Sequence, residues 1–543
     1  MSRKDQEESG RGRTNMCEMM RQLCWKGSGA VVLGWGFYVV FLVLSTHPCW
    51  QSSDCWAALI IGSQSANKFA VTRPSVNFTA GTLNGKQSGN GSVNSTAGTL
   101  NGKENGNGSV ISTAGTVNGN GTGVGIIGNG SATGLEHIMF GIAASTEKWK
   151  WRKEYIDLWW QPGKSRGYVW LDRPTPEPWP ADSPPFRISE DTSRFQFTHP
   201  NGYRSAIRVS RIVSETFRMG LPDVRWFVMG DDDTVFFTDN LVKVLGKYDH
   251  NQYYYIGSNS ECAEQNAVHS FHMAYGGGGF AISYPLAKAL ANVQDECLGR
   301  YSALYGSDQR IHACLAELGV PLTKEPGFHQ MDVHGSLLGI LAAHPLTPLV
   351  SLHHLDAVAP VFPSMTRVGA LRHLMKAAQA DPDRLVQQSI CYDRKRKWTV
   401  SVSWGYSLQI YSRVLLPRIL EYPLETFGFW RGWARFPFVF NTRPLSKDPC
   451  ENPTVLYMET VLNAGSKQIA SSYTTPAGLD KMRCNSTVNN PDEIKRVTVV
   501  SDKMYADWTK APRRHCCDVV SSTKYGMELN IRSCKDGESM SPP

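Results

Sequence analysis

RWFVMGDDDTVFF, residues Arg225 to Phe237, is the stretch that decides how this chain is interpreted. Its apolar run, Trp226 to Met229, predicts a buried strand, because aromatic and β-branched side chains suit a sheet that is covered on both faces. A glycine ends the run, and three consecutive acids follow it: Asp231, Asp232 and Asp233. The sequence therefore predicts a cluster of carboxylates at the end of a buried strand.

Three adjacent acids at a strand end repel one another unless a cation lies among them. Carboxylate oxygens suit Mg²⁺ or Mn²⁺, and such an ion typically bridges a substrate that carries phosphate. Open α/β sheets also bind ligands at the carboxyl ends of their strands. The pattern indicates a metal site, and the alternative is a solvated acidic turn that begins at Gly230.

The length and composition of the chain limit the number of domains and the class of protein. A chain of 543 residues predicts roughly two to four domains, and 41% hydrophobic with 19% charged residues is ordinary for a globular protein. The net charge of +8 is spread out, and the short basic cluster 394–397 abuts a strand-like run. We therefore expect no nucleic-acid partner.

The segment from Gly27 to Ser45 contains nineteen uncharged residues, close to the ~20 that cross a bilayer. A signal peptide or a buried helix is the alternative. Lys and Arg residues precede the segment at six positions, and none follows it before Lys68. This asymmetry predicts a cytosolic tail (1–26), a transmembrane signal anchor (27–45) and a luminal remainder, which is a single-pass type II topology.

Two further features favour the lumen of the secretory pathway. Glycosylation acceptors of the Asn-X-Ser/Thr type occur at Asn77, Asn90, Asn94, Asn107, Asn120, Asn129 and Asn485. Eleven of the thirteen cysteines lie beyond the anchor, where disulfides persist. Because eleven is odd, at least one thiol is free or pairs between chains, and the adjacent Cys516 and Cys517 are not expected to pair with each other.

A stem is predicted at 46–134. Most of it is Gly, Asn, Ser and Thr, with a repeat of seventeen residues that starts at Asn77, returns at Asn94 and decays from Ile111. A segment with so few large apolar residues cannot offset its ordering entropy by burial. We expect a flexible, glycosylated spacer.

The region 135–363 alternates between strand-like and helix-like segments. Strands are predicted at 137–145, 167–172, 226–229 and 253–257, with helices at 148–160, 205–218 and 240–245. This alternation predicts a doubly wound α/β sheet with helices on both faces.

The region 364–543 has a different pattern. Two segments, 397–411 and 454–461, alternate like half-exposed strands, which predicts a β-rich C-terminal module. Its many aromatic side chains serve either core packing or a surface on which sugars stack.

Four motifs follow one another in a specific order. They are the Asp triplet, YGGGGFAIS (275–283), GSDQRIHACLAELGV (306–320) and SLHHLD (351–356). In this order they resemble the Fringe-like, β1,3-galactosyltransferase type of glycosyltransferase, in the plant version with an uncharacterised C-terminal extension. The resemblance covers roughly 135–363 and implies a GT-A-like nucleotide-sugar-binding domain.

The resemblance also implies a metal site. Asp233 corresponds to a direct ligand of Mn²⁺ (or Mg²⁺) that bridges the donor diphosphate, while Asp231 and Asp232 reach metal, sugar or ribose oxygens. For Asp232, capping of the following turn is the alternative. His354 corresponds to the histidine that completes the metal shell, with His353 and His329 as substitutes; a structural histidine is the alternative.

Two more groups of residues take roles from the resemblance. Gly276, Gly277, Gly278 and Gly279 correspond to a loop that contacts the substrate, since glycine backbone approaches sugars and phosphates closely; a tight turn into a helix near Pro285 is the alternative. Asp308 corresponds to the general base, and an N-cap is its alternative. The chain departs from the family at Ser307, where an acid is usual.

The sequence therefore predicts an inverting, metal-dependent glycosyltransferase of the Golgi membrane. It would move a sugar from a UDP-sugar to a hydroxyl of a glycan or glycoprotein, with a β1,3 linkage. The first alternative is a catalytically decayed protein of the same family that binds glycans or nucleotide sugars, as Ser307 would allow. The second is a metal-dependent phosphohydrolase, which needs further His and Asp ligands.

Overall fold

The computed structural model describes residues 132–543 apart from 433–434, 477–483, 485–489, 506 and 543. All described residues belong to one compact unit within 121–543. The predicted tail, the signal anchor at 27–45, nearly all of the stem and the acceptor Asn485 lie outside the described residues. Within the described ranges, no helix is both long and apolar enough to cross a bilayer.

A seven-stranded sheet forms the first half of this unit, in the order β3-β2-β1-β4-β7-β6-β8. Its strands are β1 (Ile138–Ala143), β2 (Arg166–Leu171), β3 (Phe186–Ile188), β4 (Trp226–Asp231), β6 (Tyr255–Gly257), β7 (Phe280–Ser283) and β8 (Leu322–Lys324). Strand β4 pairs parallel with β1 and antiparallel with β7, while β6 pairs antiparallel with β7 and parallel with β8. The sheet is therefore mixed.

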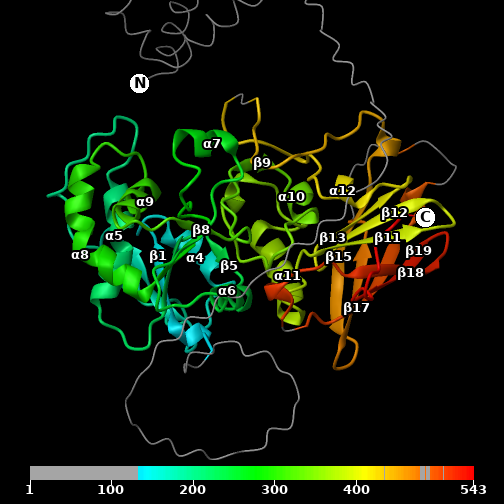
Figure 1. The fold of residues 1–543 in the computed structure, drawn as a ribbon, viewed down its shortest axis with the longest axis horizontal. Helices are drawn as coiled ribbons and strands as arrows, with labels where there is room; N and C mark the ends of the chain where they lie inside the picture. Colours follow the sequence, from blue (N-terminus) through cyan, green and yellow to red (C-terminus); the bar gives the residue numbers. More distant parts are fainter. Residues whose placement is uncertain (1–131, 433–434, 477–483, 485–489, 506, 543) are drawn as a thin grey trace, which may run out of the picture. The chain divides into compact units, whose positions relative to one another are not determined.

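Helices cover this sheet on both faces (Figure 1). They are α4 (Trp149–Ile156), α5 (Ser205–Arg218), α6 (Thr238–Leu245), α8 (Tyr284–Arg300) and α9 (Ser307–Glu317). The short helix α7 (Ala263–Val268) contributes no residue to the two cores beside the sheet. Successive residues of β4 enter different cores: Trp226 and Val228 pack in one, Phe227 and Met229 in the other. This explains why the strand before the Asp triplet is apolar at every position.

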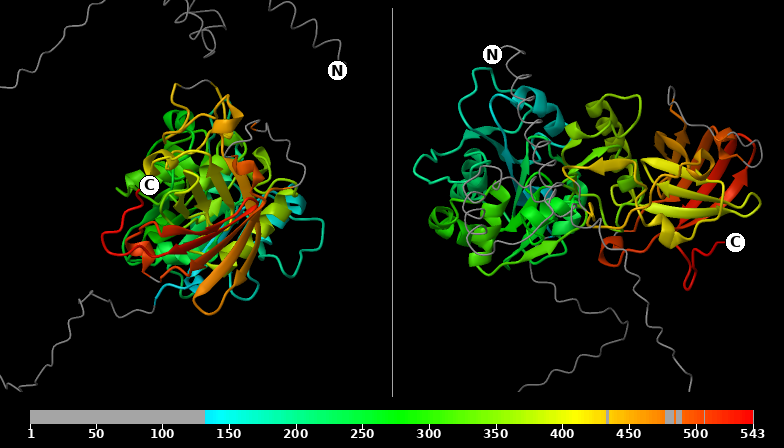
Figure 2. Two further views of the ribbon diagram at one scale, coloured as in Figure 1. Left: turned by 90° about the vertical axis from the view of Figure 1, so that its right-hand side faces the viewer. Right: turned by 90° about the horizontal axis from the view of Figure 1, so that it is seen from above.

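The second half of the unit contains an eight-stranded sheet, in the order β11-β12-β13-β15-β16-β17-β19-β18. Its strands are β11 (Gln388–Asp393), β12 (Trp398–Ser403), β13 (Ser407–Tyr411), β15 (Thr454–Asn463), β16 (Gln468–Thr474), β17 (Arg496–Asp502), β18 (Cys516–Ser522) and β19 (Gly526–Arg532). All neighbours are antiparallel except β17 and β19. In both views of Figure 2 these strands, coloured yellow to red, stay together as one curved layer.

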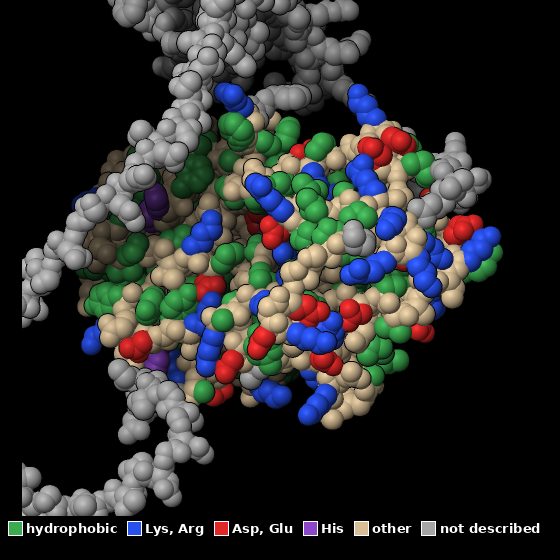
Figure 3. All heavy atoms as spheres, turned by 45° about the vertical axis from the view of Figure 1, so that its right-hand side comes forward, with side chains coloured by type: hydrophobic (Ala, Val, Ile, Leu, Met, Phe, Trp, Pro, Cys, Tyr) green, Lys and Arg blue, Asp and Glu red, His purple; other side chains and the backbone are tan. Residues whose placement is uncertain are grey.

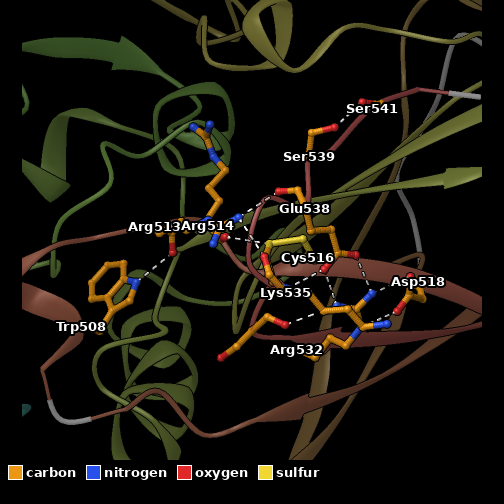
Figure 4. Close-up of a disulfide and its surroundings, with 12 residues drawn as sticks. Trp508, Arg513, Arg514, Cys516, Asp518, Arg532, Lys535, Glu538, Ser539 and Ser541 are labelled. Carbon is orange, nitrogen blue, oxygen red and sulfur yellow. Dashed lines mark hydrogen bonds and ion pairs between the residues drawn. A yellow bond between two sulfur atoms is a disulfide. The ribbon is translucent and has the colours of Figure 1, made fainter.

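The two edge strands of this sheet are joined by the disulfide Cys391–Cys517, which makes the sheet barrel-like. Further disulfides are Cys297–Cys314, Cys450–Cys484 and Cys516–Cys534, so the adjacent cysteines 516 and 517 pair elsewhere, as predicted. Among the cysteines that the structure describes, Cys262 is the free one. In Figure 4, Arg532 lies between Asp518 and Glu538 beside the Cys516–Cys534 bridge.

Shorter elements complete the unit. They are β5 (Val235–Phe236) paired with β10 (Ser351–Leu352), β9 (Val333–Gly335) paired with β14 (Phe427–Phe429), α10 (Leu338–Ala342), α11 (Arg367–Ala380), α12 (Pro417–Leu420), and 3-10 turns at Leu135–His137, Leu355–Ala357, Pro449–Glu451, Pro491–Glu493 and Trp508–Lys510. One hydrophobic core runs through both halves and includes Trp226, Trp398 and Trp404. These two C-terminal tryptophans thus serve core packing. On the face in Figure 3, Lys and Arg are interspersed with Asp and Glu.

The fold class predicted from the sequence is wrong. The sequence predicts a transmembrane helix followed by a doubly wound, GT-A-like domain and a separate β-rich module. The structure instead shows a mixed sheet with an antiparallel β7, which shares a core with a barrel-like sheet. The predicted transmembrane helix at 27–45 lies outside the described residues. A strand that is buried on both faces is apolar whatever the direction of its neighbours, so the sequence does not reveal that direction.

Candidate functional site

The Asp triplet lies where β4 ends. Asp231 is the last residue of β4, and a turn carries Asp232 and Asp233 to β5. Thr234 fixes this turn: its Oγ1 accepts from the Asp231 backbone N–H at 2.8 Å and donates to the Gly277 carbonyl at 2.7 Å. The local fold therefore ties the carboxylates to the glycine-rich loop.

One histidine completes a group of side chains with the chemistry of a metal site. His353, which follows β10, places Nε2 at 3.3 Å from Asp233 Oδ1 and 3.8 Å from Asp231 Oδ2. The three ligand atoms lie within 4.8 Å of one another. The His353 Nδ1–H donates to the Gln330 carbonyl oxygen at 3.2 Å, which directs Nε2 toward the carboxylates. Two carboxylates and one imidazole suit Mn²⁺ or Mg²⁺.

The predicted ligand His354 does not join this group. Its backbone adopts a left-handed conformation (φ 50°), and its Nδ1 lies 2.9 Å from Asp332 Oδ1. The left-handed turn sends the neighbouring imidazoles to different partners, which the spacing of SLHHLD could not show. His329, the other substitute, lies in a separate buried network with Glu261 (2.9 Å) and His344 (2.9 Å).

Arg152 is a residue of this site that the sequence did not reveal. From α4, its guanidinium forms an ion pair with Asp233 and another with Asp356 (Nη2–Oδ2, 3.1 Å), and Asp356 also accepts from the Tyr155 hydroxyl. An arginine on a helix surface is common, so no local pattern sets this one apart. Its position beside Asp233 gives the site a fixed positive charge.

Burial and charge perturb the pKa values of the site strongly. Desolvation, with repulsion from Asp233 and Asp231, raises the pKa of Asp232 to about 7. The pKa of Asp231 rises to about 6, also mainly by desolvation. The Asp231 side chain is 41% exposed, and the residue lines a small cavity. Such shifts mark a place where negative charge is crowded, and an added cation relieves that crowding.

Asp233 and His353 have pKa values shifted in the opposite directions to burial, because each lies beside a group of opposite charge. Desolvation opposes the charged form of Asp233, but His353 and Arg152 outweigh it and hold the pKa of Asp233 well below its ordinary value. Desolvation likewise opposes the charged form of His353, yet Asp233 and Asp231 raise its pKa to about 9. An imidazolium and a guanidinium thus stand where a divalent ion would otherwise neutralise the acids.

The glycine-rich loop lets three other elements approach closely. A Cβ on Gly277 would lie 2.1 Å from the His353 ring, and one on Gly276 would lie 2.8 Å from Asp308 Oδ1. Gly279 has φ +82°, where side chains are rarely tolerated, and Gly278 N–H donates to Gln330 Oε1 at 2.7 Å. The loop leads into β7 and not directly into a helix, because Phe280 to Ser283 pair with β4 and β6.

Asp308 lies on the first turn of α9, whose N-cap is Gly306. Asp308 is therefore not the N-cap that the alternative interpretation required. Its Oδ1 accepts from the Ser307 hydroxyl at 2.8 Å, so Ser307 orients the carboxylate. Asp308, Ser307, Gly276 and Asp231 line one cavity of about 20 Å³. The structure thus brings the predicted base to the same cavity as Asp231, the first acid of the triplet.

Comparison with known proteins gives one family. The model of a family described as "Protein of unknown function, DUF604" matches residues 265–517. This range contains the glycine-rich loop, Asp308 and His353, while the Asp triplet precedes it. No curated protein matches the chain.

Proposed function

We propose that this chain is an inverting, metal-dependent glycosyltransferase of the Fringe-like, β1,3-galactosyltransferase type. It would transfer a sugar from a UDP-sugar to a hydroxyl of a glycan or glycoprotein. The observation that carries the proposal is the convergence of Asp231, Asp233 and His353 with Asp308 around one glycine-rich loop. The four side chains come from three motifs and the loop is the fourth, and their chemistry is complementary.

Asp231, Asp233 and His353 would hold the metal, and Asp232 would contact the donor beside them. Mn²⁺ or Mg²⁺, when bound, supplies positive charge that stabilises the departing nucleotide diphosphate. Arg152, which forms an ion pair with Asp233, would contribute a second positive charge, because a guanidinium binds phosphate oxygens in the same way that it binds a carboxylate. The backbone N–H groups of Gly276 to Gly279 offer close approach to the sugar or phosphates.

Asp308 would act as the general base. Its carboxylate accepts the proton of the acceptor hydroxyl as that oxygen bonds to the anomeric carbon and the bond to the diphosphate oxygen breaks. The Ser307 hydroxyl donates to Oδ1 and so leaves Oδ2 for the acceptor. A serine in place of the usual acid is therefore compatible with this role.

The disulfides support a location in the secretory pathway, where such bonds persist. We place the protein in the Golgi, as the type of enzyme suggests. The second candidate function is a decayed binding protein of the same family, which Ser307 favours. A phosphohydrolase has less support, because among the described residues the Asp231–Asp233–His353 group offers ligands for one ion.

The test is a screen of UDP-sugar hydrolysis with the full-length chain and Mn²⁺, combined with calorimetric titration of UDP with and without Mn²⁺. The proposal predicts Mn²⁺-dependent UDP binding and turnover of at least one UDP-sugar. Binding without turnover or transfer supports the decayed binding protein. Cleavage of a nitrophenyl phosphate without UDP binding supports the phosphohydrolase.

A further inference from the structure

Trp430 belongs to the C-terminal half of the chain but lies beside the candidate metal site. Its indole stacks on the His354 imidazole with ring centroids 4.6 Å apart and planes at 12°. The indole also stacks on His334, at 4.8 Å and 19°. The His354 ring in turn lies 3.9 Å from the His353 ring, whose Nε2 faces Asp233. Four rings thus form a continuous stack that ends at the metal site.

Backbone hydrogen bonds fix the segment that carries Trp430. Strand β14 pairs antiparallel with β9 immediately before the tryptophan. The Ser336 N–H donates to the Thr426 carbonyl at 2.9 Å, and the Gly339 N–H donates to Thr426 Oγ1 at 2.9 Å. Beyond the tryptophan, Val439 N–H donates to the Glu261 carbonyl at 3.0 Å. Trp430 therefore directly follows a segment that backbone hydrogen bonds fix to β9 and α10.

The stack limits how far His353 can move. Among the described residues, the His353 Nδ1–H bonds to the Gln330 carbonyl at 3.2 Å, which fixes one point of the ring but not its tilt. His354, pressed between Trp430 and His353, limits that tilt. Groups that orient a metal ligand typically change metal affinity by about 10- to 100-fold when they are removed.

We propose that Trp430 is a positioning residue for the metal site, so that the C-terminal half of the chain completes the site carried by the first half. This inference rests on the proposed function, because it assumes that His353 binds a divalent ion. It assigns to the C-terminal region a part in donor binding, through His354 and His353.

The test uses the full-length chain, with Mn²⁺ and UDP as the probes and calorimetric titration as the measurement. Trp430→Ala and Trp430→Leu should each weaken Mn²⁺-dependent UDP binding about 10-fold or more; the leucine keeps apolar bulk but no ring. Trp430→Phe retains a flat ring and should restore binding to within a few-fold of the wild type. Phe436→Ala, in the same segment and 71% exposed, is the matched control and should change nothing.

A thermal melt of each variant separates positioning from folding, because Trp430→Leu and Trp430→Phe should melt at similar temperatures yet differ in binding. If Trp430→Ala or Trp430→Leu binds UDP with Mn²⁺ as tightly as the wild type, the inference is wrong and the proposed function is untouched. If the wild type shows no Mn²⁺-dependent UDP binding, the proposed function fails and the inference fails with it.

Discussion

His353 Nε2 lies 3.3 Å from Asp233 Oδ1, and this contact joins the end of β10 to the turn that follows β4. The two side chains come from motifs that are far apart in the sequence. Their approach turns an acidic triplet into a mixed carboxylate and imidazole site. The predictions below depend on this contact or on the packing that surrounds it.

The first prediction concerns the two neighbouring acids. Asp233→Asn should weaken Mn²⁺-dependent UDP binding by about 1.5–3 kcal/mol, the scale of a lost hydrogen bond to a charged group. Asp232→Asn is the matched control and should have a smaller effect, because Asp232 is outside the three-residue ligand group. Calorimetric titration measures both. Equal and negligible effects would mean that the triplet is an acidic turn and not a metal site.

The second prediction uses the glycine-rich loop. Gly277→Ala introduces a Cβ about 2.1 Å from the His353 ring, so the imidazole or the loop must shift and the contact of His353 with Asp233 should be disturbed. Mn²⁺-dependent UDP binding should fall about 10-fold or more, since a displaced ligand no longer reaches the ion. Gly299→Ala on α8 meets nothing within 4 Å and should leave binding unchanged. Wild-type affinity in Gly277→Ala would show that His353 does not bind the ion.

The third prediction concerns pH and the C-terminal sheet. Burial, and to a smaller extent repulsion from Arg384, lowers the pKa of His515 from 6.5 to about 4. Its Nδ1 accepts from Arg384 Nη2 at 3.0 Å and must be unprotonated to do so. As the pH falls from 6.5 toward 4, the unfolded chain binds this proton before the folded chain does, so the free energy of unfolding decreases.

His515→Gln removes that proton site, so its free energy of unfolding should depend less on pH across the same interval. Urea denaturation at several pH values measures the difference between the variant and the wild type. Parallel pH profiles would contradict the assignment of a depressed pKa to His515.

The segments that form the candidate site could be located from the sequence because they are local motifs, and the family resemblance supplied the roles expected of them. The strand before the Asp triplet, the glycine-rich loop and the acid at the start of α9 each carry a pattern that a few residues define. The predicted helix at 205–218 is α5 with the same bounds. The periodicity of apolar residues and the residue preferences of turns involve only neighbours in the sequence, so a short stretch of sequence is enough to detect them.

The rest depends on contacts between distant segments. Arg152 and Trp430 reach the site through the packing of α4 and β14, and nothing beside them in the sequence marks their partners. The choice of His353 over His354 follows from one left-handed backbone conformation. The sequence does not reveal the antiparallel direction of β7 either, because a strand in either direction buries the same apolar side chains.

The central claim is that these groups form a site for sugar transfer, and Asp308→Asn tests it most directly. The substitution keeps the shape of the side chain and its position on α9, so the fold and Mn²⁺-dependent UDP binding should stay nearly unchanged. A general base acts on the acceptor in the transition state, so loss of base catalysis should lower transfer by about 10²–10⁴-fold. The measurement is transfer to glycoprotein acceptors from the UDP-sugar that the hydrolysis screen identifies, beside UDP titration of the same samples. The account predicts a large loss of transfer with intact UDP binding, and transfer at the wild-type rate would contradict it.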